Sequence, residues 1–258
     1  MLVLGIETAT EHSSVALVEA ANEVAAWREV SRQDLCRRLA AEAAHLLARA
    51  AQQGSAAPLP SAAQFRDLDL IAVGLGPGSF TSLRVGLATA KAFAFALDKP
   101  LVGVSSLEAM CWQERDRLPG LACPVLDARR GELYAAVYRT SAESLQLAAP
   151  EFVATPEALA EKLAQLGEPV ALFGQTDCLT DEQAEAFTEK RVTVWREQVS
   201  RGAQLRCPPV VLPDALAVAE LGRTRFQARG PDDIAPLRPI YVRMSYAEEA
   251  ASIDLGLR

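Results

Sequence analysis

The fold of this chain is decided by the stretch Ile71-Ala-Val-Gly-Leu-Gly-Pro-Gly-Ser-Phe-Thr-Ser-Leu-Arg-Val-Gly86. Its apolar first residues predict a buried strand, which breaks at a Gly-Pro-Gly turn. An Ala-rich segment follows at once and predicts a helix over 80–97. A strand that passes through a tight turn into a helix is typical of α/β proteins.

The turn in this stretch brings backbone N–H groups together at a helix N-terminus, an arrangement that can hold a phosphate or another anion. Gly76 and Gly78 tolerate backbone angles that other residues avoid and let a ligand come close. Ser79 is a candidate N-cap. The turn has neither the Lys-Ser/Thr of a Walker loop nor G-x-G-x-x-G spacing, so a tight connection that binds nothing remains an alternative.

The segments on either side of this stretch alternate between strand and helix patterns. Upstream, the sequence predicts strands at 2–7, 13–18, 23–30 and 69–74, a helix at 32–53 and a Pro/Ser/Ala linker at 54–61. The short turns between the first three strands favour an antiparallel start to a sheet. Downstream, it predicts strands at 101–104, 124–126, 132–140 and 170–173, and helices at 107–117, 156–166, 181–189 and 214–226.

This mixture in both halves favours an α/β or α+β protein of two lobes. We expect an N-terminal lobe over 1–105, joined by a returning helix near 214–228, and a C-terminal lobe over 106–213. The proline-rich remainder, 229–258, is expected to form a tail that is mobile after Arg243.

The bulk composition restricts the function classes. The chain has 258 residues, of which 50% are hydrophobic and 23% charged, enough for a full core. A formal net charge of −7 argues against a stand-alone nucleic-acid binder. Five cysteines without a C-x-x-C pair fit a reducing cytosol. The N-terminus lacks the pattern of a signal peptide, and Lys91, Asp98 and Lys99 interrupt the best apolar run, so we predict a cytoplasmic protein without a membrane span.

The predicted helix at 80–97 is unusually apolar, and its only charges are Arg84 and Lys91. Small side chains recur every four residues along it, at Ser82, Gly86, Ala90 and Ala94. Such a helix is either part of the core or half of a helix-to-helix subunit interface. Because Arg84 and Lys91 need a polar environment, we favour the interface.

Five blocks of sequence resemble a known family when taken together and in order. They are Val3-Leu-Gly-Ile-Glu-Thr-Ala-Thr-Glu-His-Ser-Ser-Val-Ala-Leu17, Gly76-Pro-Gly-Ser-Phe-Thr-Ser-Leu-Arg-Val-Gly86, Gly103-Val-Ser-Ser-Leu-Glu-Ala109, Asp127-Ala-Arg-Arg-Gly-Glu-Leu-Tyr134 and Pro239-Ile-Tyr-Val-Arg243. From about residue 2 to residue 243 the chain resembles the TsaB family of bacterial tRNA threonylcarbamoyladenosine biosynthesis subunits. The resemblance implies an α/β, two-lobed actin/sugar-kinase/Hsp70-like (ASKHA) fold with mixed sheets flanked by helices.

The resemblance also implies a role. A TsaB-like subunit pairs with a catalytic paralogue, TsaD, and a small P-loop ATPase, TsaE, joins them. We therefore expect a non-catalytic scaffold that activates the TsaD-like subunit, meets tRNA only indirectly through the complex, and forms a homodimer when alone. It would need no cofactor of its own, although ATP or ADP could bind in the complex.

The catalytic relatives carry an H-x-x-x-H metal pair where this chain has Ser106-Leu-Glu-Ala-Met110. A hydroxyl and a thioether are poor replacements for two imidazoles. The chain's histidines, His12 and His45, lie elsewhere and are interpreted as surface or helix residues. We therefore expect no catalytic residue and no metal in this chain.

Two groups of residues are the candidate sites. Tentative phosphate contacts are Thr8, Thr10, Gly76, Gly78 and Ser79. The candidate interface on the first two helices consists of Leu35, Leu39, Leu83, Arg84, Gly86, Leu87, Ala90, Lys91, Phe93 and Ala94. Each apolar member of the second group is also a candidate core residue.

Other functions remain open at this point. An active phosphotransferase or ATPase of the sugar-kinase type would use Glu7 and Asp127 with the phosphate turns, although Asp127 could instead cap a turn with Arg129 and Arg130. A metallopeptidase-like activity would require the missing histidine pair. Direct tRNA recognition would use Arg129, Arg130 and Arg37-Arg38, which are more typical of solvated charge.

Overall fold

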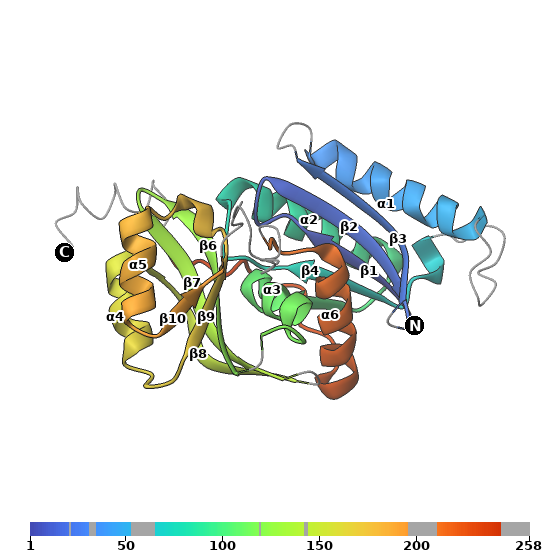
Figure 1. Cartoon of the computed structure of the whole chain (residues 1–258). Helices are drawn as coiled ribbons and strands as arrows, with labels where there is room; N and C mark the ends of the chain where they lie inside the picture. The colour runs from blue at the N-terminus through green and yellow to red at the C-terminus, as the bar shows by residue number, and fades with distance from the viewer. Residues whose placement is uncertain are drawn as a thin grey trace.

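Two five-stranded sheets lie side by side in the computed structural model of the chain (Figure 1). The structure describes residues 1–20, 22–30, 35–52, 65–118, 120–141, 144–195 and 211–243. The predicted linker at 54–61 and the predicted mobile tail after Arg243 lie outside these described residues. The expected fold class, two lobes of mixed sheet flanked by helices, is confirmed.

The first sheet has the strand order β3-β2-β1-β4-β5. Its strands are β1 (Leu2–Glu7), β2 (His12–Glu19), β3 (Asn22–Val30), β4 (Leu70–Gly74) and β5 (Leu101–Val104). The first three pair antiparallel, as the short turns between them predict, whereas β4 and β5 run parallel to β1. The parallel strands are buried on both faces, which explains their continuous apolar runs.

Helices cover both faces of this sheet (Figure 1). On one face, α1 (Leu35–Gln52) and α2 (Phe80–Leu97) share a core with the alternate side chains of β1 and β2. On the other face lies α6 (Ala215–Arg229), which returns from the far end of the chain. It lies close to β1 because Gly5 has no side chain; a Cβ there would lie 2.1 Å from the carbonyl oxygen of Ala215.

The second sheet repeats the topology of the first, with the order β10-β9-β6-β7-β8. Its strands are β6 (Gly120–Arg129), β7 (Glu132–Thr140), β8 (Leu145–Ala154), β9 (Val170–Gly174) and β10 (Val192–Val194). Helices α4 (Pro156–Ala164) and α5 (Asp181–Glu189) pack on one face, and α3 (Ser106–Glu114) packs on the other. Because α3 also contacts α6, it joins the two lobes. Two short 3-10 helices, η1 (Phe65–Asp67) and η2 (Thr176–Cys178), complete the described elements.

The sequence did not predict β8 or β10. Strand β8 is an edge strand with mostly exposed or half-buried residues and an internal Pro150, so its apolar alternation is weak. Strand β10 has only three residues. Strand β6 is longer than predicted, since Pro124 interrupts its pairing with β7 without ending the strand.

The small-residue strip of α2 faces inward, which corrects the predicted subunit interface. A Cβ on Gly86 would lie 2.3 Å from Oγ1 of Thr8. The small residues of the strip therefore leave room for the chain's own first turn to pack against α2. The predicted interface residues that are buried inside this chain are Leu35, Leu39, Leu83, Gly86, Leu87, Ala90 and Ala94. Of the remaining three, Arg84 is exposed, while Lys91 and Phe93 are half-buried.

Helix α2 also passes the length and composition test for a membrane span, contrary to the prediction that no apolar run is long enough. Of the three charged residues expected to interrupt this run, Lys91 lies within the helix, whereas Asp98 and Lys99 follow its last residue. One third of the helix is buried in the described structure, where it packs on the first sheet. Its apolar composition therefore reflects one face in the core and a second apolar face outside it.

Candidate functional site between the two lobes

The side chain of Glu7, at the end of β1, closes the first turn of the chain from inside. Its Oε1 accepts the backbone N–H of Thr8 at 2.7 Å and that of Ala9 at 2.6 Å. Its Oε2 accepts the hydroxyl of Ser106 at 2.8 Å. Glu7 is fully buried, and desolvation raises its pKa to about 7 despite these hydrogen bonds.

The Gly-Pro-Gly turn is held by the same group of residues. Ser106 accepts the N–H of Gly76 on its hydroxyl at 3.1 Å and donates its own N–H to the Gly76 carbonyl at 2.8 Å. The N–H of Ser79 donates to the carbonyl of Ala9 at 2.7 Å. Two N–H groups of the turn are therefore used within the protein. Ser79 does stand at the N-cap of α2, but its side chain makes no capping bond.

The five predicted phosphate contacts separate into two groups. Thr8 is fully buried and donates its hydroxyl to the carbonyl of Ser82 at 2.9 Å, and Gly76 is buried below Leu83. Among the described residues, neither of these two lines the interlobe cavity, which corrects the prediction for them. Thr10, Gly78 and Ser79 do line the cavity between the lobes.

This interlobe cavity has a volume of about 680 Å³. The first lobe contributes residues 9–11, the first turn of α2 and Arg84. The second lobe contributes residues 126–129, Tyr134 and Gln175. The described end of the chain, residues 240–243, forms a further wall.

That final segment fastens the two lobes together. The N–H of Ile240 donates to the carbonyl of Leu75 at 2.8 Å, and the Tyr241 hydroxyl accepts Nε–H of Arg84 at 3.1 Å, both in the first lobe. In the second lobe, Arg243 donates to the carbonyl of Ala128 at 3.2 Å and forms an ion pair with Glu132. The segment thus contacts both lobes beside the cavity.

Asp127 caps its own turn, as the alternative to a catalytic role predicted. Its Oδ1 accepts the N–H of Arg129 at 2.7 Å, and its Oδ2 lies 3.1 Å from the Arg129 guanidinium. Its N–H donates to the amide oxygen of Gln175 at 2.9 Å. The carboxylate is therefore already neutralised by its own hairpin.

The positions of the catalytic relatives' metal pair are filled by the core. Ser106 and Met110 are both fully buried, and Met110 Cε lies 2.6 Å from where a Cβ of Gly174 would be. His12 lies at the start of β2, and His45 is exposed on α1 beside Glu42. Within the described ranges, no cluster of three or more His, Cys, Asp or Glu side chains could hold a metal ion.

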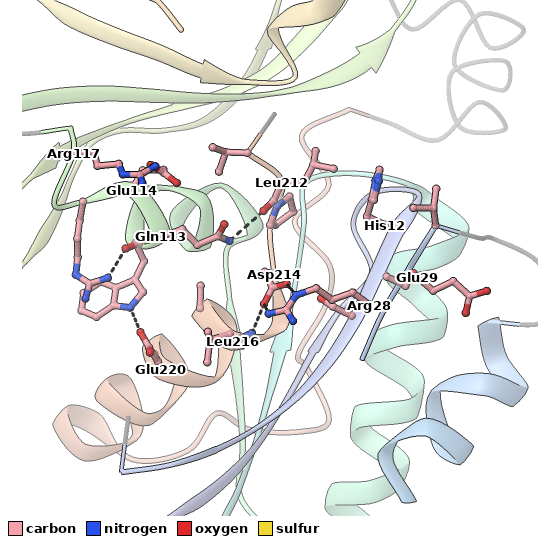
Figure 2. A pocket seen from close by; sticks show the side chains of 18 residues that line it. His12, Arg28, Glu29, Gln113, Glu114, Arg117, Leu212, Asp214, Leu216 and Glu220 are labelled. Atoms are coloured by element: carbon pink, nitrogen blue, oxygen red, sulfur yellow. Dashed lines mark hydrogen bonds and ion pairs between the residues drawn. The ribbon is translucent and has the colours of Figure 1, made fainter. Parts of the chain in front are cut away.

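A second cavity, of about 950 Å³, lies between α3, α6 and the ends of β2 and β3. Figure 2 shows that Arg28 and Asp214 turn toward each other, whereas Glu29 points away from them. Arg28 donates to Asp214 at 2.6 Å, and Trp112 donates to Glu220 at 2.5 Å. None of the predicted site residues lines this cavity.

Sequence reasoning missed several residues of the interlobe cavity. Phe80, Tyr134 and Gln175 line it, and Tyr241 and Arg243 close it. The block Pro239-Ile-Tyr-Val-Arg243 was noticed only as part of the resemblance. An aromatic and an arginine beside prolines in a supposed tail were a usable signal, since mobile tails rarely need them.

The comparisons with known proteins agree with this architecture. Residues 57–179 match the family model "TsaD: tRNA N6-adenosine threonylcarbamoyltransferase". Two solved structures from Pseudomonas aeruginosa share the fold. One, described as YeaZ, has a TM-score of 0.68 and 24% identity and covers 93% of this chain and 99% of its own. The other, an uncharacterized protein with similarity to peptidase YeaZ, has a TM-score of 0.70 and 22% identity over 94% and 99%.

Two curated relatives show to which family this chain belongs. The TsaB protein of Escherichia coli is 28% identical over 252 residues, which are 96% of this chain and 96% of that protein. The TsaB protein of Bacillus subtilis is 32% identical over 183 residues, which are 71% of this chain and 73% of that protein. The chain therefore belongs to the TsaB family of tRNA threonylcarbamoyladenosine biosynthesis proteins.

Proposed function

We propose that this chain is a non-catalytic subunit of the machinery that makes tRNA N6-threonylcarbamoyladenosine, and that it docks a TsaD-like catalytic paralogue through α2 and the adjacent α1. The names of its relatives support the pathway. The match of residues 57–179 to the TsaD family model supports a paralogous pair of similar shape. A TsaE-like ATPase would join this pair.

The observation that carries the proposal is the outer face of α2. Phe95 is 86% exposed, and Ala88, Ala92 and Ala96 beside it are exposed as well. An exposed large aromatic among small side chains on a rigid helix is the composition of a docking site, because the small residues let a second helix approach closely. This face replaces the buried strip at Gly86 as the candidate interface.

The two carboxylates near the interlobe cavity support a role without catalysis, because both are already engaged within the protein. A sugar-kinase-type enzyme needs a carboxylate that can hold a metal at the first turn and an acid opposite. In this chain Glu7 is enclosed by Thr8, Ala9 and Ser106, while Asp127 is paired with Arg129. The subunit would then act by packing alone and require no cofactor.

The net charge of this chain indicates which subunit binds tRNA. With a net charge of −7, this chain is a poor surface for tRNA phosphates, so the paralogue would make the main contact with tRNA. Any ATP or ADP in the complex would bind to the other subunits. When the paralogue is absent, a second copy of this chain could cover the outer face of α2.

The test is co-purification with the TsaD homologue encoded in the same genome, together with threonylcarbamoyl transfer to tRNA in a reconstituted reaction. Phe95→Asp should weaken binding of that homologue by about thirtyfold or more and lower transfer in parallel, since buried aromatic anchors contribute most at interfaces. Leu147→Asp is the matched control, because Leu147 is 57% exposed on β8 in the other lobe.

Because Phe95 is already exposed, Phe95→Asp should leave the melting temperature unchanged. Binding of Phe95→Asp with the affinity of the unmodified chain would refute docking through α2. Transfer of a threonylcarbamoyl group to tRNA by this chain alone would refute the non-catalytic role.

A further inference from the structure

Two positive charges line one edge of the outer face of α2. Arg84 and Lys91 are seven residues apart, which is close to two helical turns, so they project along the same edge. Ala88 and Phe95 lie on the outer face next to this edge. The edge is therefore the charged rim of the proposed docking face.

Neither cation has a carboxylate partner in the part of the chain that the structure describes. The Arg84 guanidinium lies 3.7 Å from the centre of the Phe80 ring, and its Nε donates to the Tyr241 hydroxyl at 3.1 Å. The Lys91 ammonium donates to the carbonyl of Ala235 at 3.3 Å. Both are thus positioned by neutral groups, and no carboxylate among the described residues pairs with them.

A second copy of α2 has no carboxylate within the helix to pair with Arg84 and Lys91. Between Phe80 and Leu97 the helix contains no Asp or Glu, and the nearest acid, Asp98, follows its last residue. An antiparallel two-fold pair lays the same edge of both copies together. The register that places Arg84 beside Asp98 of the second copy also places Lys91 against its own counterpart. In this register, pairing of α2 with a second copy of α2 therefore brings two like charges together.

We infer that Arg84 and Lys91 select the docking partner: they favour a helix of a different protein that carries carboxylates along this edge, and they disfavour pairing with a second copy. The inference rests on the proposed docking through α2. Charged rims act in this manner at other interfaces, because opposite charges steer association and like charges penalise the wrong partner. The homodimer expected from the resemblance would then be the weaker of two competing assemblies.

The test measures two equilibria with one variant, Lys91→Met, which keeps the length of the side chain and removes its charge. Binding to the TsaD homologue should weaken by about tenfold, and self-association should become several-fold tighter. Raising the salt concentration should shift the unmodified chain in the same two directions. A merely damaged helix would weaken both assemblies together.

Lys162→Met is the matched control, because Lys162 is also a lysine on a helix but lies on α4 in the other lobe. Its ammonium lies 3.6 Å from the centre of the Phe152 ring. Affinities are measured by calorimetry and self-association by sedimentation equilibrium. If Phe95→Asp abolishes binding while Lys91→Met leaves both equilibria unchanged, charge selection is wrong and docking through α2 stands. If neither variant changes binding of the homologue, the docking proposal itself fails.

Discussion

The β1–β2 turn of the first lobe and the β6–β7 turn of the second occupy equivalent places in two sheets of the same strand order. In both, a carboxylate near the end of the first strand accepts N–H groups of the turn that follows. Glu7 is fully buried and bonded to the start of α3, whereas the Asp127 side chain is 26% exposed and bonded to its neighbour Arg129. The same kind of hydrogen bond should therefore contribute more to stability at Glu7 than at Asp127. Water can replace the Asp127 carboxylate as an acceptor, but it cannot reach the N–H groups around the buried Glu7.

The largest expected effect separates these two carboxylates directly. Glu7→Ala leaves the N–H groups of Thr8 and Ala9 and the Ser106 hydroxyl without an acceptor inside the protein, and should lower the free energy of unfolding by about 4 kcal/mol. Asp127→Ala should lower it by less than about 1 kcal/mol, since water can reach its turn. Urea denaturation of both variants measures the difference, and equal losses would contradict the comparison.

The pH dependence of stability should come from the first turn. Burial raises the pKa of Glu7 from 4.5 to about 7, so the folded state binds its proton more tightly than the unfolded state does. The free energy of unfolding should therefore be highest below pH 4.5 and fall by up to about 3 kcal/mol as the pH rises to about 7. Glu7→Gln, which has no proton to lose, should remove this slope; an unchanged slope would assign it to other groups.

The first turn can also be disturbed from the side of α2. Gly86→Leu places its side chain against Oγ1 of Thr8, 2.3 Å from the Cβ position, and should lower the free energy of unfolding by about 2 kcal/mol through overpacking. Ala88→Leu, on the exposed face of the same helix, should change it by less than about 0.5 kcal/mol. A normal melting temperature for Gly86→Leu would show that the strip is not needed for packing within the chain.

The smallest expected effect isolates the link between the first turn and α3. Ser106→Ala removes the hydroxyl that donates to Glu7 and accepts from Gly76, and should lower the free energy of unfolding by about 1 kcal/mol. Thermal unfolding of Ser106→Ala in the Glu7→Gln background checks the coupling. Strictly additive losses would mean that the two side chains act independently.

Sequence reasoning gave the elements of the first lobe well because each has a strong local signal. Helix α2 has its predicted bounds, since Gly-Pro-Gly precedes it and Lys99-Pro100 follows it. Strands β8 and β10 were missed because edge exposure and short length remove the apolar pattern. Local patterns thus identify buried elements more readily than exposed ones.

The orientation of α2 could not be obtained in the same way. The helix carries small residues on two faces, one through Gly86 and Ala90 and the other through Ala88 and Ala92. Which face is buried depends on the close approach of Thr8, which lies far away in the sequence. The hydrogen bond between Glu7 and Ser106 is likewise a contact between segments that periodicity does not relate.

The return of α6 to the first sheet has a consequence for synthesis. Strand β1 is synthesised first, but the helix that covers it, α6, is synthesised only after the entire second lobe. Until then the face of the sheet that α6 covers is bare, so the early chain exposes apolar side chains that could associate with other nascent chains. We expect a fragment that ends before Asp214 to aggregate, whereas adding the α6 peptide to it should restore solubility.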